Sequence, residues 1–132
     1  MPKHIFIFTL IIILAACNGV GTRKKAEGLE TAIDEYVAAL RWGRFDNAIK
    51  YHVDKDNNNP EIDTSKLEHI KVTGHVFKKK TVNEEIDEAT LQIEMQYYHK
   101  EYGTLKKIII DQEWWFNEDA KNWFLSSDFP KF

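Results

Sequence analysis

The stretch Ala89-Thr90-Leu91-Gln92-Ile93-Glu94-Met95-Gln96-Tyr97 alternates apolar and polar side chains at every step. In an extended chain, successive side chains point to opposite faces, so this period of two gives one apolar and one polar face. The stretch therefore predicts a β-strand with one face in the core and one in solvent. A half-buried sheet is expected at the centre of the fold.

Three more segments on either side of this stretch have strand character. Upstream, Ile70, Val72, Gly74 and Val76 alternate with polar residues, and we expect all four on one buried face. Downstream, a strand is predicted over residues 105–116 and a shorter one over residues 123–126. The charged residues between the segments suit solvated hairpin turns, which discourage pairing between sheet edges.

Before the strands, the apolar period is that of a helix. One stripe of apolar side chains consists of Leu29, Ile33, Tyr36, Val37 and Leu40. Gly43 ends this helix, a shorter helix is expected over residues 45–53, and residues 54–60 have the composition of a loop. Helices followed by consecutive antiparallel strands predict an α+β fold, with N-terminal helices packed on a curved antiparallel sheet of about four strands.

This order of elements resembles the cystatin-like cone shared by nuclear-transport-factor-like and ketosteroid-isomerase-like proteins. The resemblance covers residues 26–132 and rests on element order and length. It implies a pocket between helix and curved sheet, which in some relatives holds a general base. None of their catalytic residues can be matched to a position of this chain.

Composition sets the scale of the molecule. The chain has 132 residues, of which 43% are hydrophobic and 30% charged, with a net charge of -3. These values suit one small globular domain, which we place at residues 26–132. A mild excess of acidic residues does not favour nucleic acid as a partner, because phosphate binding needs concentrated Lys and Arg.

The first sixteen residues are predicted to be a signal peptide. Lys3 precedes an apolar run over residues 5–14, which would rise only about 15 Å as a helix. A bilayer core needs about 30 Å, so the run is too short for a permanent span. A charged start, a short apolar centre and a small-residue exit are typical of secretion signals.

The exit Leu14-Ala15-Ala16-Cys17 resembles the bacterial lipobox at every position. The resemblance implies that the Cys17 sulfur receives a diacylglyceryl group and that cleavage follows Ala16. The mature chain would then be held in a membrane by acyl chains on Cys17. An ordinary signal peptide with a chance cysteine is the alternative.

Residues 17–25 are predicted to be the lipidated N-terminus and a flexible tether, because they contain two glycines, a basic end and no apolar period. Asn18 follows the cysteine, and the enterobacterial sorting rule that this resembles retains Asp-bearing lipoproteins in the inner membrane. The expected location is therefore the outer membrane, with the domain facing the periplasm. Cys17 is the single cysteine, so no internal disulfide can form.

The sequence offers no motif for catalysis, a metal or a cofactor. The histidines of the domain, His52, His69, His75 and His99, have no chelating spacing on one helix face. No Gly-x-Ser-x-Gly or glycine-rich phosphate loop is present. We expect no catalytic residue, no bound metal and no cofactor.

A ligand pocket, if the domain has one, is expected around Tyr36, Trp42, Gln112 and Trp114. Period two places one group of side chains on a single face of its strand: Ile108, Ile110, Gln112, Trp114 and Phe116. Gln112 is the one amide on this apolar face, and a buried amide needs either structural partners or a ligand. Both interpretations stay open, with the structural one favoured.

Trp115 falls on the opposite face of the same strand and, with Phe124, is the candidate for a partner-binding surface. The alternative is that a small domain without disulfides uses such aromatic residues to fill its core. The sequence therefore predicts a non-enzymatic binding or assembly module of the cell envelope. A small-ligand carrier with a pocket between helix and sheet is the second hypothesis, and the enzyme hypothesis ranks last.

Overall fold

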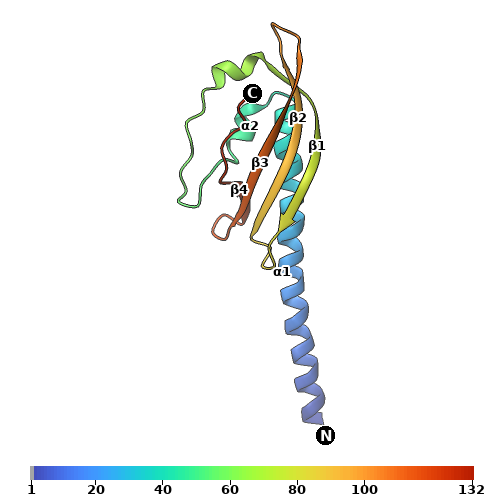
Figure 1. The fold of residues 1–132 in the computed structure, drawn as a ribbon. Coiled ribbons are helices and arrows are strands. Elements are labelled where there is room, and N and C mark those ends of the chain that lie inside the picture. Colours follow the sequence, from blue (N-terminus) through green and yellow to red (C-terminus); the bar gives the residue numbers. More distant parts are fainter. Residues whose placement is uncertain (1) are drawn as a thin grey trace.

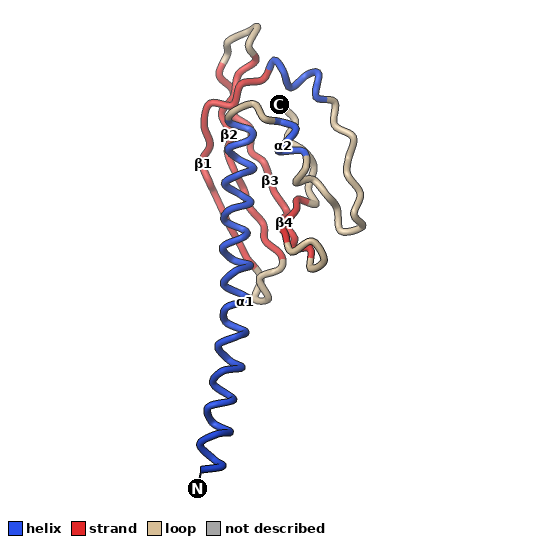
Figure 2. Tube along the Cα trace, turned by 180° about the vertical axis from the view of Figure 1, so that it is seen from behind, coloured by secondary structure: helices blue, strands red, loops and turns tan. Residues whose placement is uncertain are grey.

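The computed structural model describes the backbone of residues 2–132 and the side chains of residues 21–132. The elements follow the order α1 (Pro2–Arg41), α2 (Phe45–Ile49), the 3-10 helix η1 (Thr64–His69), β1 (Ile70–Val82), β2 (Glu88–His99), β3 (Leu105–Asn117) and β4 (Asn122–Leu125). The strands form one antiparallel sheet in the order β1-β2-β3-β4. The α+β prediction is confirmed: α1 lies along one face of this open sheet (Figures 1 and 2).

The core fills the space between α1 and the face of the sheet that it covers, which we call the inner face. The apolar stripe predicted for the helix is buried along its length, from Leu29 to Leu40. Opposite it, the strand with the cleanest alternation buries Leu91, Ile93 and Met95. Removal of these apolar surfaces from water is the main force that holds α1 on the sheet.

The prediction that Val76 lies on the buried face is wrong. The pairing of β1 with β2 shifts between Val72 and Gly74, which is the mark of a β-bulge. A single extra residue reverses the faces of everything that follows in a strand. Val76 is consequently 45% exposed, on the outer face opposite Glu94, although Ile70 and Val72 are buried as predicted.

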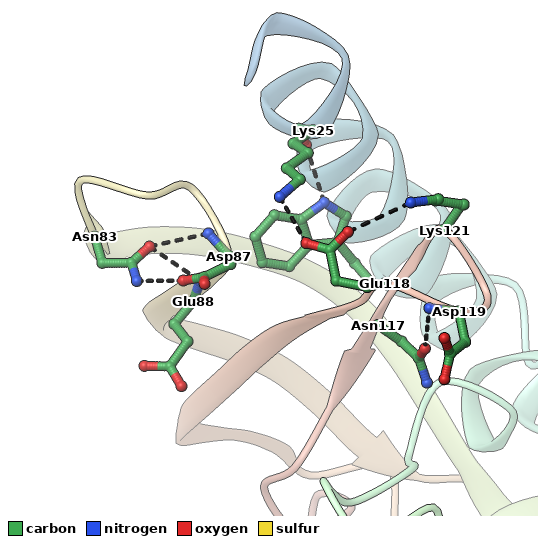
Figure 3. Close-up of polar contacts among 9 residues, drawn as sticks. Lys25, Asn83, Asp87, Glu88, Asn117, Glu118, Asp119 and Lys121 are labelled. Carbon is green, nitrogen blue, oxygen red and sulfur yellow. Dashed lines mark hydrogen bonds and ion pairs between the residues drawn. The ribbon is translucent and has the colours of Figure 1, made fainter. Parts of the chain in front are cut away.

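Helix α1 continues through residues 18–25, where a flexible tether was predicted. At Lys25, the backbone carbonyl accepts a hydrogen bond from Trp123 Nε1 at 2.9 Å. The Lys25 ammonium also lies 2.8 Å from a carboxylate oxygen of Glu118, in the turn between β3 and β4 (Figure 3). These contacts come from residues almost a hundred positions away, so local composition could not indicate them. The domain therefore begins no later than Lys25.

Ala16 and Cys17 lie outside the part of the chain whose side chains the structure describes, so cleavage and lipidation stay predictions. Among the described residues, no helix is both long enough and apolar enough to cross a membrane.

The domain has two ends along the axis of α1. At the end that faces the N-terminal part of α1 lie the two hairpin turns over residues 83–87 and 118–121, which we call the anchor end (Figures 1 and 3). At the opposite end, α1 gives way to α2, and the β2–β3 turn projects (Figures 1 and 2). Arg41, Trp42 and Lys71 lie together there and are called the tip.

Candidate functional site

The structure brings three of the four predicted pocket residues together, but as part of the core. Tyr36, Gln112 and Trp114 are each 2% exposed or less. The Tyr36 and Trp114 rings meet edge to face at 5.9 Å, and Trp114 Nε1 donates to Gln112 Oε1 at 2.9 Å. These side chains fill the space they were expected to enclose. Trp42 is 66% exposed and belongs to the tip, so the predicted pocket is wrong.

If Gln112 had a purely structural role, both polar atoms of its side chain should have hydrogen-bond partners. Only one of them does in the described part of the chain. Its oxygen accepts from Trp114, whereas its Nε2 has no hydrogen-bond partner among the described residues. A buried, unpaired amide nitrogen is costly, because its bonds to water are lost without replacement.

A buried hydrogen-bonded chain runs beside this cluster. The Tyr36 hydroxyl donates to His52 Nε2 at 2.7 Å, and His52 Nδ1 donates to the Ser127 carbonyl at 2.9 Å. Burial lowers the pKa of His52, against the opposing effects of the Ser127 carbonyl and the Asp128 charge. Burial also raises the pKa of Tyr36. Both side chains are buried in the core, and no sequence signal marked His52 as a buried partner of Tyr36.

The predicted partner surface is wrong for Trp115. This side chain is only 9% exposed, and its Nε1 donates to the Val53 carbonyl at 2.7 Å. The segment after α2 pairs beside β4, since Leu125 N donates to the Tyr51 carbonyl and Val53 N donates to the Leu125 carbonyl. This strand-like segment places Val53 against Trp115, and the contact shields the Trp115 side chain from solvent.

Phe124 keeps partial exposure because it lines a cleft between α1, α2 and β4. The cleft has a volume of about 480 Å³. It is lined by charged, amide and apolar side chains: Glu35, Ala38, Ala39, Arg44, Asn47, Lys50, Tyr51, Asn122 and Phe124. We call it the α1–β4 cleft. Sequence reasoning missed it, because its residues come from three separated segments and most of them are polar.

The α1–β4 cleft is built around one fixed acid and two free cations. The Tyr51 hydroxyl donates to Glu35 Oε2 at 2.5 Å. Burial, followed by this bond to Glu35, raises the pKa of Tyr51 well above its usual value. Arg44 and Lys50 form no ion pair with any of the residues described. The cleft thus presents two unpaired cations and one carboxylate beside the Phe124 ring, an excess of one positive charge.

The tip combines an exposed aromatic ring with two cations. The Arg41 guanidinium carbon lies 5.9 Å from the Trp42 ring centroid, and Lys71 Nζ lies 5.7 Å from it. Arg41 also donates to the Val72 carbonyl, which fixes the guanidinium. Within the described part of the chain, neither cation has a carboxylate partner. The tip is thus an exposed indole, 66% accessible, beside two cations.

The anchor end has the opposite character. Its turns carry a group of acidic residues: Glu84, Glu85, Asp87, Glu118 and Asp119. Glu118 lies between Lys25 and Lys121, and both cations lower its pKa (Figure 3). Asn83 closes the other turn through bonds to Asp87 and to the Glu88 amide. The two turns of the anchor end thus carry mainly acidic side chains, with Lys25 and Lys121 paired to Glu118, whereas the tip carries two cations.

Comparison with models of known protein families, with curated proteins and with solved structures finds no match for this chain.

Proposed function

We propose that this protein is a bacterial membrane-anchored lipoprotein whose domain is a non-enzymatic binding module of the cell envelope. Acyl chains on Cys17, with cleavage after Ala16, would hold it in the outer membrane facing the periplasm. The proposal is supported by the match of Leu14-Ala15-Ala16-Cys17 to the lipobox at every position and by Asn18 after the cysteine. Two or three acyl chains anchor a protein stably where one does not.

The tip is the proposed contact surface for an envelope protein. The observation that carries this proposal is Trp42, 66% exposed and flanked by the cations of Arg41 and Lys71. Tryptophan and arginine are the residues most enriched among those that dominate binding energy at interfaces. Positive groups without a partner favour an acidic surface on the other molecule.

The position of the tip, at the end of the domain opposite the N-terminal part of α1, gives the interaction a direction. An anchor on Cys17 turns the acidic anchor end toward the membrane and the basic tip away from it. Two copies in the same membrane point the same way, so the acidic end of one cannot meet the tip of the other. We therefore propose that the partner is a different molecule, which reaches the tip from the side away from the anchor.

The small-ligand carrier hypothesis is not supported at the place where it was expected. Tyr36, Trp114 and Met95 pack the space between α1 and the sheet, and each is 2% exposed or less. The enclosed Tyr36–His52 pair supports a non-enzymatic role, because packing separates it from solvent.

The proposal is tested by placing a photoreactive amino acid at position 42 of the full-length protein in its own cells. We expect a crosslinked protein adduct from position 42 and none from position 85 at the anchor end. The adduct should disappear with Lys71→Glu and persist with Lys24→Glu, which makes the same charge change elsewhere. An adduct that survives Lys71→Glu, or equal adducts from both positions, would exclude the tip as the contact surface.

A further inference from the structure

We infer that the α1–β4 cleft is a binding site for an organic carboxylate with an aromatic body. This inference is independent of the tip, because Trp42 and Lys71 do not line the cleft. It gives the domain a small-molecule site on its surface, in place of the interior pocket that the sequence predicted.

The carboxylate of the ligand would bind to the two unpaired cations of the cleft. Arg44 and Lys50 line the cleft without an ion pair to any residue described, and Glu35 is already engaged by the Tyr51 hydroxyl. An arginine presents a planar fork that matches a carboxylate, and a lysine adds a mobile point charge. With one fixed acid against two cations, the cleft has a single positive charge in excess. It therefore matches a monoanion.

The aromatic body of the ligand would pack against the rings and small side chains of the same cleft. Phe124 is partly buried, and the Trp115 ring lies 5.9 Å behind it. Tyr51 supplies a second ring, which packs edge to face on Trp114 at 5.8 Å. On the helix side, Ala38 and Ala39 are short, and the longer Glu35 side chain is turned to the Tyr51 hydroxyl. Offset or edge-to-face contact with these rings favours an aromatic ligand over an aliphatic one.

The cleft has the size of a small-molecule site, and one of its rings is held in place. A volume of about 480 Å³ lies within the range typical of small-molecule sites. Tyr51 is held at its hydroxyl by Glu35 and at its carbonyl by Leu125 N. A site whose side chains are already fixed loses less conformational entropy when a ligand binds. Asn47 and Asn122 add amide groups that can orient the carboxylate.

The test is an NMR titration of the mature, lipid-bearing chain in a neutral detergent, with the side-chain amides of Asn47 and Asn122 as reporters. Four probes separate the parts of the inference: 1-naphthylacetate, acetate, 1-naphthalenemethanol and octanoate. We expect saturable shifts with 1-naphthylacetate and much weaker binding of the other three. The four probes partition into micelles to different extents, so each affinity is expressed against the free probe concentration, measured in micelles without protein.

Charge-neutral variants identify the residues involved. Arg44→Gln and Lys50→Gln should each weaken 1-naphthylacetate binding by about tenfold, since a charge-assisted hydrogen bond is lost. Lys66→Gln, the same change on an exposed lysine outside the cleft, should leave binding unchanged. All three positions are exposed, so the fold should be retained, and the Trp123 indole resonance checks this.

Several results would overturn the inference. Equally tight binding of acetate would show a simple anion site, and equally tight binding of 1-naphthalenemethanol would show an apolar groove. Octanoate equal to 1-naphthylacetate would exclude the aromatic preference. Equal loss in Lys66→Gln would show attraction to net charge alone. Each of these outcomes leaves the crosslinking test of the tip unaffected.

Discussion

The hydroxyl oxygen of Tyr36 lies 2.7 Å from Nε2 of His52, and the other nitrogen of the same imidazole lies 2.9 Å from the Ser127 carbonyl. One buried ring thus joins α1, the segment after α2 and the C-terminal segment after β4. The Phe129 ring packs on the imidazole at 5.2 Å. The relationship makes a neutral histidine part of the framework that positions the α1–β4 cleft.

The stability of the domain should decrease in mild acid because of His52. Burial lowers the pKa of His52 in the folded state, whereas in the unfolded chain the pKa is about 6.5. The unfolded state therefore binds the proton more readily, and folding stability is lost as the pH falls below about 6.5. Urea unfolding midpoints between pH 8 and pH 5 measure this effect. His52→Gln should reduce the dependence of the urea midpoint on pH, whereas His75→Gln, at an exposed histidine, should leave it unchanged. A urea midpoint of the natural protein that does not vary between pH 8 and pH 5 would contradict the assignment.

Trp115 should behave as a structural residue. Trp115→Ala removes a largely buried indole and should lower the free energy of unfolding by about 3 kcal/mol. Trp115→Phe keeps most of the apolar contact and loses the bond to the Val53 carbonyl, for a cost of about 1 kcal/mol. Chemical denaturation measures both. An unchanged melting temperature for Trp115→Ala would instead show that Trp115 lies on the exposed surface, as the sequence suggested.

Two glycines test whether the helix extends into the predicted tether. Both lie in α1, and a Cβ at Gly28 would make only ordinary contacts of 3.6 and 3.7 Å with Trp123. A Cβ at Gly21 would meet nothing within 4 Å. Alanine at either position should therefore stabilise the domain by about 0.5–1 kcal/mol through helix propensity. If only Gly28→Ala is stabilising, residues near Gly21 are a tether in solution.

Alternation and helical period predicted the elements of the sheet and of α1 because these patterns reflect burial on one face. They failed where one residue changes the pattern, as in the bulge that turns Val76 outward. They also failed where a distant segment supplies the partner. Lys25 is fixed by Trp123 and Glu118, and Trp115 is covered by the segment that contains Val53.

The candidate sites were less predictable than the fold. Period two placed Gln112 and Trp114 on the correct face, but it says nothing of whether the space in front of them is empty or filled. The α1–β4 cleft joins Glu35, Arg44, Lys50 and Phe124, which share no local pattern. The tip depends on β1 bringing Lys71 to the end of α1, a consequence of the sheet's position that only the fold supplies.

The most direct measurement of the central claim is native mass spectrometry of the lipoprotein, extracted gently from its own membrane with and without Lys71→Glu. The account predicts a chain that begins at an acylated Cys17 and retains a partner protein at fixed stoichiometry, and it predicts that Lys71→Glu releases this partner. A chain that keeps residues 1–16 without acyl groups, or a partner retained equally by Lys71→Glu, would contradict it.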